Sequence, residues 1–173
     1  MNTEQLKQTI RNIPDFPKEG ILFRDITTLL KNPEAFNSMI SLIAEKLKDK
    51  DIDIVIGPEA RGFIVGAAVA HAIGAGFVPA RKQGKLPCEV NKISYGLEYG
   101  SDCLEVHKDA ILPGQRVAVV DDLLATGGTA LAVIRLVEQL GAEPVAAAFA
   151  VELTELDGRE TLKNYDVISL IKY

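Results

Sequence analysis

The stretch of residues 117–130, VAVVDDLLATGGTA, decides the fold. It begins with an unbroken apolar run, which is typical of a strand buried on both faces of a parallel sheet. The run ends in two acids, Asp121 and Asp122, and a loop with two adjacent glycines leads into a helical pattern. Ligands of open α/β sheets bind outside the carboxyl ends of the strands. The stretch therefore predicts a strand–loop–helix unit of such a sheet, with a ligand site in its loop.

Apolar strands and amphipathic helices alternate on both sides of this stretch. The pattern predicts strands over 53–57, 77–80, 116–122, 145–151 and 166–171, and helices over 3–11, from 33 onward, over 61–73 and over 128–140. Asn32 before Pro33 is a typical helix start. Residues 13–30 are rich in proline and glycine and are expected to be irregular. The alternation indicates the α/β class, with a parallel twisted sheet flanked by helices.

Residues 81–108 interrupt the alternation. Apolar residues recur at every second position before and after Gly100-Ser101, which predicts an antiparallel hairpin with its turn at that dipeptide. This turn would place Cys103 opposite about Glu98 and far from Cys88. The two cysteines also lack C-x-x-C spacing, and no signal-peptide pattern is present. We therefore expect reduced thiols in a cytoplasmic protein.

The composition excludes several classes of protein. The 173 residues carry 19 Lys+Arg against 24 Asp+Glu, a net charge of −5 that argues against nucleic-acid and membrane-surface binding. The length predicts one domain. Residues 62–80 contain no Asp, Glu, Lys or Arg and are long enough to cross a bilayer. Gly74-Ala75-Gly76 divides them, however, so we expect a buried helix and a buried strand there.

The loop after the two acids has the chemistry of a phosphate site. Ala125, Thr126, Gly127, Gly128 and Thr129 offer backbone N–H groups, two hydroxyls and a helix N-terminus. No lysine follows the glycines and no G-x-G-x-x-G opens a helix, which excludes a P-loop and a dinucleotide fingerprint. The alternative is an ordinary turn with Thr129 as helix cap.

The acids Asp121 and Asp122 repel a phosphate but suit what lies next to it. Carboxylates accept hydrogen bonds from a ribose diol, and they can approach Mg²⁺ directly or through water. Together with the loop, they describe a ribose-5-phosphate site. An ordinary turn does not account for two adjacent acids at the end of an apolar strand.

Two further segments could meet an anion. Arg81, Lys82 and Lys85 form a basic cluster in an acidic chain, which is either a solvated loop or a clamp for a pyrophosphate. The sequence GPEARG (57–62) lies between an expected strand and helix. Its N–H groups and Arg61 suit an anion, but a plain turn with Arg61 in solvent fits equally well.

These motifs carry a family resemblance. VVDDLLATGGT (119–129) resembles the 5-phosphoribosyl-1-pyrophosphate (PRPP) motif of type I phosphoribosyltransferases. Supporting segments spread over nearly the whole chain: FPKEGILFRDIT (16–27), GPEARGF (57–63), RKQGKLP (81–87), YGLEYG (95–100) and VELTELDGRE (151–160). The first of these and the LEYG segment point to the adenine-using branch of the family.

The resemblance implies an architecture and a set of binding residues. It implies one domain over 1–173, with an N-terminal hood over about 1–32 and a flexible hairpin flap over about 81–108. It implies that PRPP contacts Glu59, Ala60, Arg61, Gly62, Arg81, Lys82, Lys85, Tyr99, Asp121, Asp122 and residues 125–129, with a non-proline cis peptide in the 59–62 loop.

The resemblance also implies which residues hold the base and which are catalytic. It implies that adenine lies between Phe23 and Leu153 and is read by the backbones of Leu22 and Arg24. Glu98 and Arg61 are the implied catalytic residues, with Glu98 handling the proton at base N7. On sequence pattern alone, Phe23 would be a core residue and Glu98 the solvent-facing member of a strand.

The implied activity is purine salvage. Adenine and PRPP would give AMP and pyrophosphate with Mg²⁺, held indirectly by Asp121 and Asp122, in a homodimer whose basic segment reaches the neighbouring site. One alternative is a transferase for hypoxanthine or xanthine. A second is a non-catalytic PRPP-sensing regulator, which would need a DNA-binding extension and a basic face.

Overall fold

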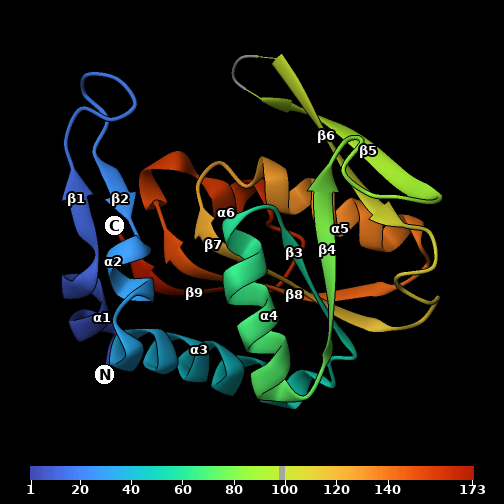
Figure 1. Ribbon diagram of the computed structural model, residues 1–173, viewed down its shortest axis with the longest axis horizontal. Helices are drawn as coiled ribbons and strands as arrows, with labels where there is room; N and C mark the ends of the chain where they lie inside the picture. The colour runs from blue at the N-terminus through green and yellow to red at the C-terminus, as the bar shows by residue number, and fades with distance from the viewer. Residues whose placement is uncertain (98–99) are drawn as a thin grey trace.

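The computed structural model describes residues 1–97 and 100–173, and a seven-stranded sheet runs through them in the order β5-β6-β4-β3-β7-β8-β9 (Figure 1). The strands are β3 (Ile54–Pro58), β4 (Gly76–Lys82), β5 (Val90–Leu97), β6 (Gly100–His107), β7 (Arg116–Leu124), β8 (Glu143–Glu152) and β9 (Val167–Lys172). Strands β4, β3, β7, β8 and β9 pair in parallel, and β6 and β5 pair antiparallel beyond β4. The α/β class with a mostly parallel sheet is confirmed.

Helices cover both faces of the sheet. Helices α3 (Pro33–Leu47) and α4 (Arg61–Ile73) pack on one face, and α5 (Gly128–Gln139) packs on the other (Figure 1). Successive residues of β7 enter different cores: Ala118 and Val120 pack with α3 and α4, while Val117 and Val119 pack with α5. Burial on both faces is the reason that this strand is an unbroken apolar run.

Most predicted boundaries hold within two residues. The helix start at Pro33 is confirmed, because the Asn32 side chain accepts hydrogen bonds from the N–H groups of Glu34 and Ala35 at 3.0 and 3.1 Å. Strand β7 contains both acids, as predicted, and continues two residues beyond the predicted end at Asp122. Pairing with β8, which reaches Leu124↔Glu152, extends the strand.

The N-terminal region differs from its prediction. Helix α1 (Thr3–Thr9) ends before Arg11, where β1 (Arg11–Ile13) begins. The region 13–30, predicted to be irregular, contains β2 (Phe23–Asp25) and α2 (Thr27–Leu30). Strands β1 and β2 pair antiparallel as a separate two-stranded sheet. Strands of three residues are too short to show an alternating pattern, so the sequence could not reveal them.

The hairpin β5–β6 is confirmed, but its predicted turn is wrong. Gly100 and Ser101 pair with Leu97 and Gly96 as strand residues, and Cys103 lies opposite Ser94. Glu98 and Tyr99 lie outside the described residues. The register is set where Leu104 and Val106 enter the core beside α5, and this outweighs the turn preference of a Gly-Ser dipeptide.

The remaining elements are short. They are the 3₁₀ helices η1 (Lys48–Lys50) and η2 (Thr154–Leu156), and the helix α6 (Gly158–Thr161). Both cysteines are free thiols. None of the described helices has the length and apolar character that crossing a membrane requires.

Candidate active site

A polar cavity lies at the carboxyl end of β7. It has a volume of about 280 Å³ and is lined by residues 59–61 and 121–130. The loop 125–129 forms one wall, with Gly127 at φ +84° as the residue that caps α5. This left-handed conformation favours glycine. The cavity therefore presents a helix N-terminus and a glycine-rich backbone to a ligand, as an anion site requires.

The two acids in this cavity have different surroundings. Asp122 is buried, and its carboxylate accepts a hydrogen bond from the Arg61 Nε. The Asp121 carboxyl lies against the start of α4, where a Cβ on Gly62 would come within 2.9 Å of Oδ1. Burial raises the pKa of Asp121 well above its ordinary value, and the neighbouring Asp122 carboxylate raises it further. Gly62 thus leaves the space that Asp121 occupies.

Arg61 supplies the positive charge between these acids. Its partial burial would lower the pKa of the guanidinium, but its hydrogen bond to Asp122 and the charges of both acids outweigh that and raise the pKa. Arg61 is therefore paired with Asp122, although its side chain remains 48% exposed. The pairing keeps a buried carboxylate from standing alone, which would be strongly destabilising.

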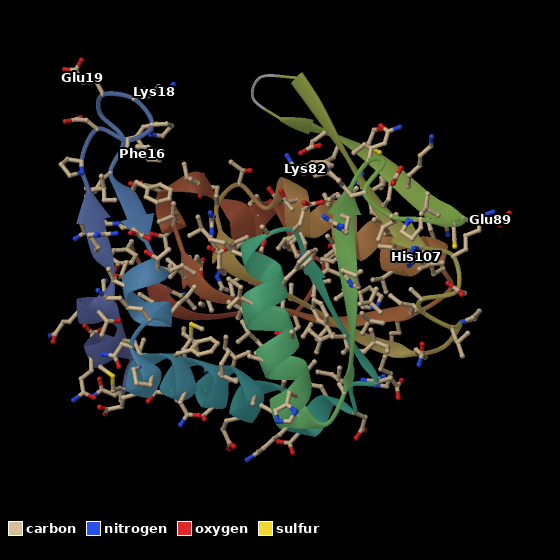
Figure 2. All side chains as sticks on the ribbon, in the orientation of Figure 1. Phe16, Lys18, Glu19, Lys82, Glu89 and His107 are labelled. Atoms are coloured by element: carbon tan, nitrogen blue, oxygen red, sulfur yellow. The ribbon has the colours of Figure 1, made fainter. Side chains whose placement is uncertain are left out.

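The loop before α4 connects this cavity to the basic segment. The Glu59–Ala60 peptide bond is cis. The Glu59 Oε1 accepts a hydrogen bond of 2.6 Å from the N–H of Lys82 and lies 3.5 Å from the Arg81 Nε. Lys82, labelled in Figure 2, also forms an ion pair of 3.1 Å with Asp102 of β6. The basic segment is thus fastened at the foot of the hairpin.

The hairpin also touches the glycine-rich loop. The hydroxyls of Tyr95 on β5 and Thr129 on α5 lie 3.5 Å apart. Burial raises the pKa of the Tyr95 phenol, so the group stays protonated at neutral pH. The contact places the hairpin beside the polar cavity.

A second cavity, of about 290 Å³, lies beside the N-terminal two-stranded sheet. It is lined by Ile13, Phe16, Phe23, Arg24, Asp25, Ile26, Thr27 and Arg61. The rings of Phe16 and Phe23 meet edge to face, with centroids 5.1 Å apart. Figure 2 shows Phe16 near the base of the loop between β1 and β2, with Glu19 at the outer tip. Phe23 is thus a cavity residue rather than a core residue.

The polar side chains beside this cavity are held by their neighbours. The Arg24 guanidinium bonds to the Asn12 side chain at 2.5 Å and stacks on the Tyr173 ring at 3.9 Å. Asp25 accepts hydrogen bonds from the hydroxyl and N–H of Thr27 and from Arg11. The Thr27 hydroxyl and Arg11 together lower the pKa of Asp25 to about 2. This ionised carboxylate fixes the junction of β2 and α2.

The described residues offer few ligands for a metal ion. No group of three or more His, Cys, Asp or Glu among them is arranged to hold one. Asp121 and Asp122 are the carboxylates in the polar cavity besides Glu59, which is engaged with the basic segment. These residues fit a metal ion that takes most of its oxygen ligands from a bound polyanion. They do not fit a metal site made by protein side chains alone.

Comparison with known proteins agrees with this geometry. The phosphoribosyl transferase domain family matches residues 25–171. The adenine phosphoribosyltransferase of Clostridium acetobutylicum is 60% identical over 168 residues, covering 97% of this chain and 98% of the relative. That of Alkaliphilus metalliredigens is 62% identical, covering 97% and 99%. The chain belongs to the adenine phosphoribosyltransferase family.

Solved structures of adenine phosphoribosyltransferases share the fold over the whole chain. The one from Thermoanaerobacter pseudethanolicus is 55% identical with a TM-score of 0.96, covering 99% of this chain and 100% of that one. The one from Giardia lamblia, complexed with 9-deazaadenine, is 38% identical with a TM-score of 0.94, covering 100% and 98%. The fold of this chain is therefore that of the adenine phosphoribosyltransferase family.

The two cavities contain many of the residues that resemblance to adenine phosphoribosyltransferases implied. Glu59, Ala60, Arg61, Asp121, Asp122 and residues 125–129 line the polar cavity, and Phe23, Arg24 and Arg61 line the other. Among the described residues, Gly62, Arg81, Lys82, Lys85, Leu22 and Leu153 line neither. The expected Glu98 and Tyr99 lie outside the described residues.

Sequence reasoning gave a role to three residues of the second cavity and missed the other five, which are Ile13, Phe16, Asp25, Ile26 and Thr27. Phe16 and Asp25 both lie in the segment FPKEGILFRDIT but were given no role. The pattern F-P-x-x-G-x-x-F was a signal for Phe16, because a proline and a glycine between two aromatic residues favour a loop that brings them together. No local pattern indicated Asp25, because its partner Arg11 is brought to it by strand pairing.

Proposed function

We propose that this protein transfers the 5-phosphoribosyl group of PRPP to adenine, giving AMP and pyrophosphate in purine salvage. One observation carries the proposal: a polar cavity with two acids and a glycine-rich helix start shares the Arg61 side chain with an apolar cavity that contains two aromatic rings. A phosphorylated sugar and a flat base fit such a pair of cavities. The relatives at about 60% identity are named for this reaction.

The 5′-phosphate would bind residues 125–129, and the ribose diol would bind Asp121 and Asp122. The N–H groups at the start of α5 complement the phosphate charge. A carboxylate accepts the two hydroxyl hydrogen bonds that a diol offers. Burial and the neighbouring Asp122 raise the pKa of Asp121. The positive charges of Arg61 and of a ligand cation would favour its ionised form.

The pyrophosphate would leave toward the cations. Arg61 lies beside it, and the loop 59–62 contributes backbone N–H groups. Arg81, Lys82 and Lys85 would approach from the foot of the hairpin, where Glu59 fastens the segment. Stabilising charge as it develops on a leaving group is among the largest contributions to catalysis.

Mg²⁺ is the proposed cofactor, and Asp121 and Asp122 would hold it indirectly through the PRPP diol or water. When bound, it would supply positive charge that favours departure of the pyrophosphate. The protein's own part is orientation: Asp121, Asp122 and the loop hold the sugar so that its C1′ faces the second cavity.

Adenine would occupy the second cavity with its ring on Phe23. The backbones of Leu22 and Arg24 would read its edge, which Arg24 allows by directing its side chain to Asn12 and Tyr173. Leu153 would close the opposite side. By family resemblance, Glu98 would handle the proton at N7, and Tyr99 would accompany it. N9 of adenine would attack C1′ with inversion as pyrophosphate leaves.

We further propose that residues of about 1–32 act as a hood, that about 81–108 act as a flap which excludes water, and that one domain spans 1–173. The protein would act in the cytoplasm as a homodimer. The outward face of α4 supports the dimer, since Ile64 there is 47% exposed and Ala67, one turn later, is also exposed. Sedimentation equilibrium at micromolar concentration tests the assembly.

The direct test is incubation with Mg²⁺, PRPP and each purine base in turn, with products separated by anion-exchange chromatography. AMP from adenine, with no nucleotide from hypoxanthine, guanine or xanthine, is the expected result. Nucleotide from hypoxanthine or xanthine instead would indicate the other purine specificity. Absence of nucleotide with every base would exclude the enzyme and favour a PRPP-sensing regulator.

A further inference from the structure

A short segment after β8 lies directly behind the glycine-rich loop. It comprises η2 and α6, and it touches the loop at two backbone positions. A Cβ on Gly127 would lie 2.8 Å from the carbonyl oxygen of Gly158, and a Cβ on Gly158 would lie 2.3 Å from that of Ala125. Because these distances admit no side chain, the two backbones are in direct contact.

Thr161 adds a polar contact at the same place. Its hydroxyl donates a hydrogen bond of 2.7 Å to the carbonyl oxygen of Thr126. Its Cβ lies 3.0 Å from where a Cβ on Gly127 would be. Thr126 and Gly127 line the polar cavity whereas Thr161 does not, so the Thr161 hydroxyl approaches the loop from outside the cavity.

Because a peptide group is planar, the hydrogen bond from Thr161 also fixes the direction of the next N–H group. The C=O of Thr126 and the N–H of Gly127 belong to one planar peptide group. In a trans peptide they point in opposite directions. Holding the carbonyl toward Thr161 therefore directs the Gly127 N–H toward the opposite side, which is the cavity.

Helix α6 is itself anchored to the sheet. Arg159 donates hydrogen bonds of 2.7 and 2.9 Å to the two carboxylate oxygens of Glu152, and others of 3.0 Å to the Val167 carbonyl and the Ser169 hydroxyl. The Glu152 side chain is 4% exposed. Burial would raise the pKa of Glu152, but Arg159 and Ser169 outweigh it and hold the pKa below its ordinary value. Arg159 therefore faces an ionised partner.

We propose that Thr161 is a positioning residue for the phosphate site, held in place by the Glu152–Arg159 ion pair. Its hydroxyl fixes the Thr126–Gly127 peptide so that the Gly127 N–H faces the phosphate of PRPP. The inference rests on the proposed function, because it assigns that cavity to PRPP. Thr161 touches no substrate and acts only through the loop.

The test compares three purified variants by steady-state kinetics. Thr161→Val keeps the shape of the side chain and removes its hydroxyl, Thr161→Ser keeps the hydroxyl, and Thr154→Val is the matched control. Thr154 is also exposed and donates a 2.5 Å hydrogen bond to a carbonyl, that of Tyr173, away from the loop.

Thr161→Val should raise the KM for PRPP about three- to tenfold, the effect of losing one hydrogen bond. The KM for adenine and kcat should stay within about twofold, because the base cavity and reacting atoms are untouched. Thr161→Ser should restore the KM for PRPP, and Thr154→Val should leave it unchanged. An unchanged KM for PRPP in Thr161→Val, or an equal rise in both KM values, would overturn the inference.

Calorimetric titration with ribose 5-phosphate separates this inference from the proposed reaction. Weaker ribose 5-phosphate binding in Thr161→Val, and not in Thr154→Val, supports the positioning role even if the wild-type protein forms no nucleotide. Equal affinity in the wild type and Thr161→Val would overturn it, even if the wild-type protein forms AMP.

Discussion

The two cavities are almost equal in volume, about 280 and 290 Å³, but they are built in different ways. The polar one is formed at the carboxyl end of β7 by main chain, glycines and two acids. The other is formed by the two-stranded sheet β1–β2, an element outside the main sheet, and its walls include two aromatic rings. The general α/β rule placed the first cavity, whereas no such rule placed the second.

This difference separates two tasks. The sheet fixes the polar cavity rigidly, because β7 is an interior strand that pairs with β3 and β8. The second cavity depends instead on the β1–β2 sheet, which is separate from the main sheet. Arg61 is the residue that both cavities share. Variants that affect one cavity, the other, or both therefore test the separation.

The largest effect is expected from a double variant that changes the polar cavity alone. Replacing Asp121 and Asp122 together by Asn removes both charged acceptors for the diol, and charged hydrogen bonds contribute roughly 1.5–3 kcal/mol each. We expect kcat/KM for PRPP to fall about 100-fold or more. The measurement is AMP formation over a range of PRPP concentrations.

Asp166→Asn is the control for this pair, since Asp166 forms a surface ion pair with Lys50 far from both cavities. It should behave like the wild type. Wild-type kinetics in the double variant would contradict the ribose assignment of the two acids.

The next effect should appear in both cavities at once. Arg61→Gln removes the cation between them and leaves the buried Asp122 carboxylate unpaired. We expect kcat/KM to fall roughly 10- to 100-fold, with the KM for adenine and the KM for PRPP both raised. Arg61→Lys, which keeps the charge without the planar fork, should recover part of the loss. A change in one KM only would show that the cavities do not share this residue functionally.

A smaller effect should be confined to the second cavity. Phe23→Ala removes the ring on which the base would stack, a contact worth roughly 1–3 kcal/mol per base. The KM for adenine should rise about 10-fold while the KM for PRPP stays unchanged. Phe23→Tyr keeps the ring and serves as the control. Equal changes in both KM values would argue that Phe23 is a core residue.

The smallest effect concerns the stability of the second cavity in acid. The folded-state pKa of Asp25, about 2, lies below the ordinary 3.8. Its charge therefore stabilises the fold above about pH 4, and this contribution is lost as the pH falls through about 2. Urea unfolding at pH 6 and pH 3 should show Asp25→Asn less stable by up to about 2 kcal/mol at pH 6, with a smaller deficit at pH 3. The same deficit at both pH values would contradict the assignment.

Much of the fold follows from periodicity. The apolar runs of β3, β7 and β8 and the stripe of α3 are long enough to identify their elements. The strands β1 and β2 have three residues each and carry no such signal. The hairpin turn was misplaced because a local Gly-Ser preference was weighed without the packing of Leu104 and Val106.

The residues of the candidate site also fall into those that the sequence predicted and those that it did not. Residues 121–129 are contiguous, so their spacing alone indicated a sugar–phosphate site. The pairs Arg61–Asp122 and Arg11–Asp25 join residues from different elements, and no local pattern predicted them. The sequence likewise gave no indication of the role of Thr161, because that role depends on the backbone contact between Gly127 and Gly158.

The sequence by itself determined the order of strands and helices, the glycine-rich loop after two acids, and the family. These depend on residues close together in the chain, where hydrophobic period and backbone chemistry act directly. Only the tertiary structure decided which charges pair, that Phe16 meets Phe23, and that α6 supports the phosphate loop. Such contacts join distant segments, and they exist only after the apolar faces of the elements have packed and fixed the distances between their side chains.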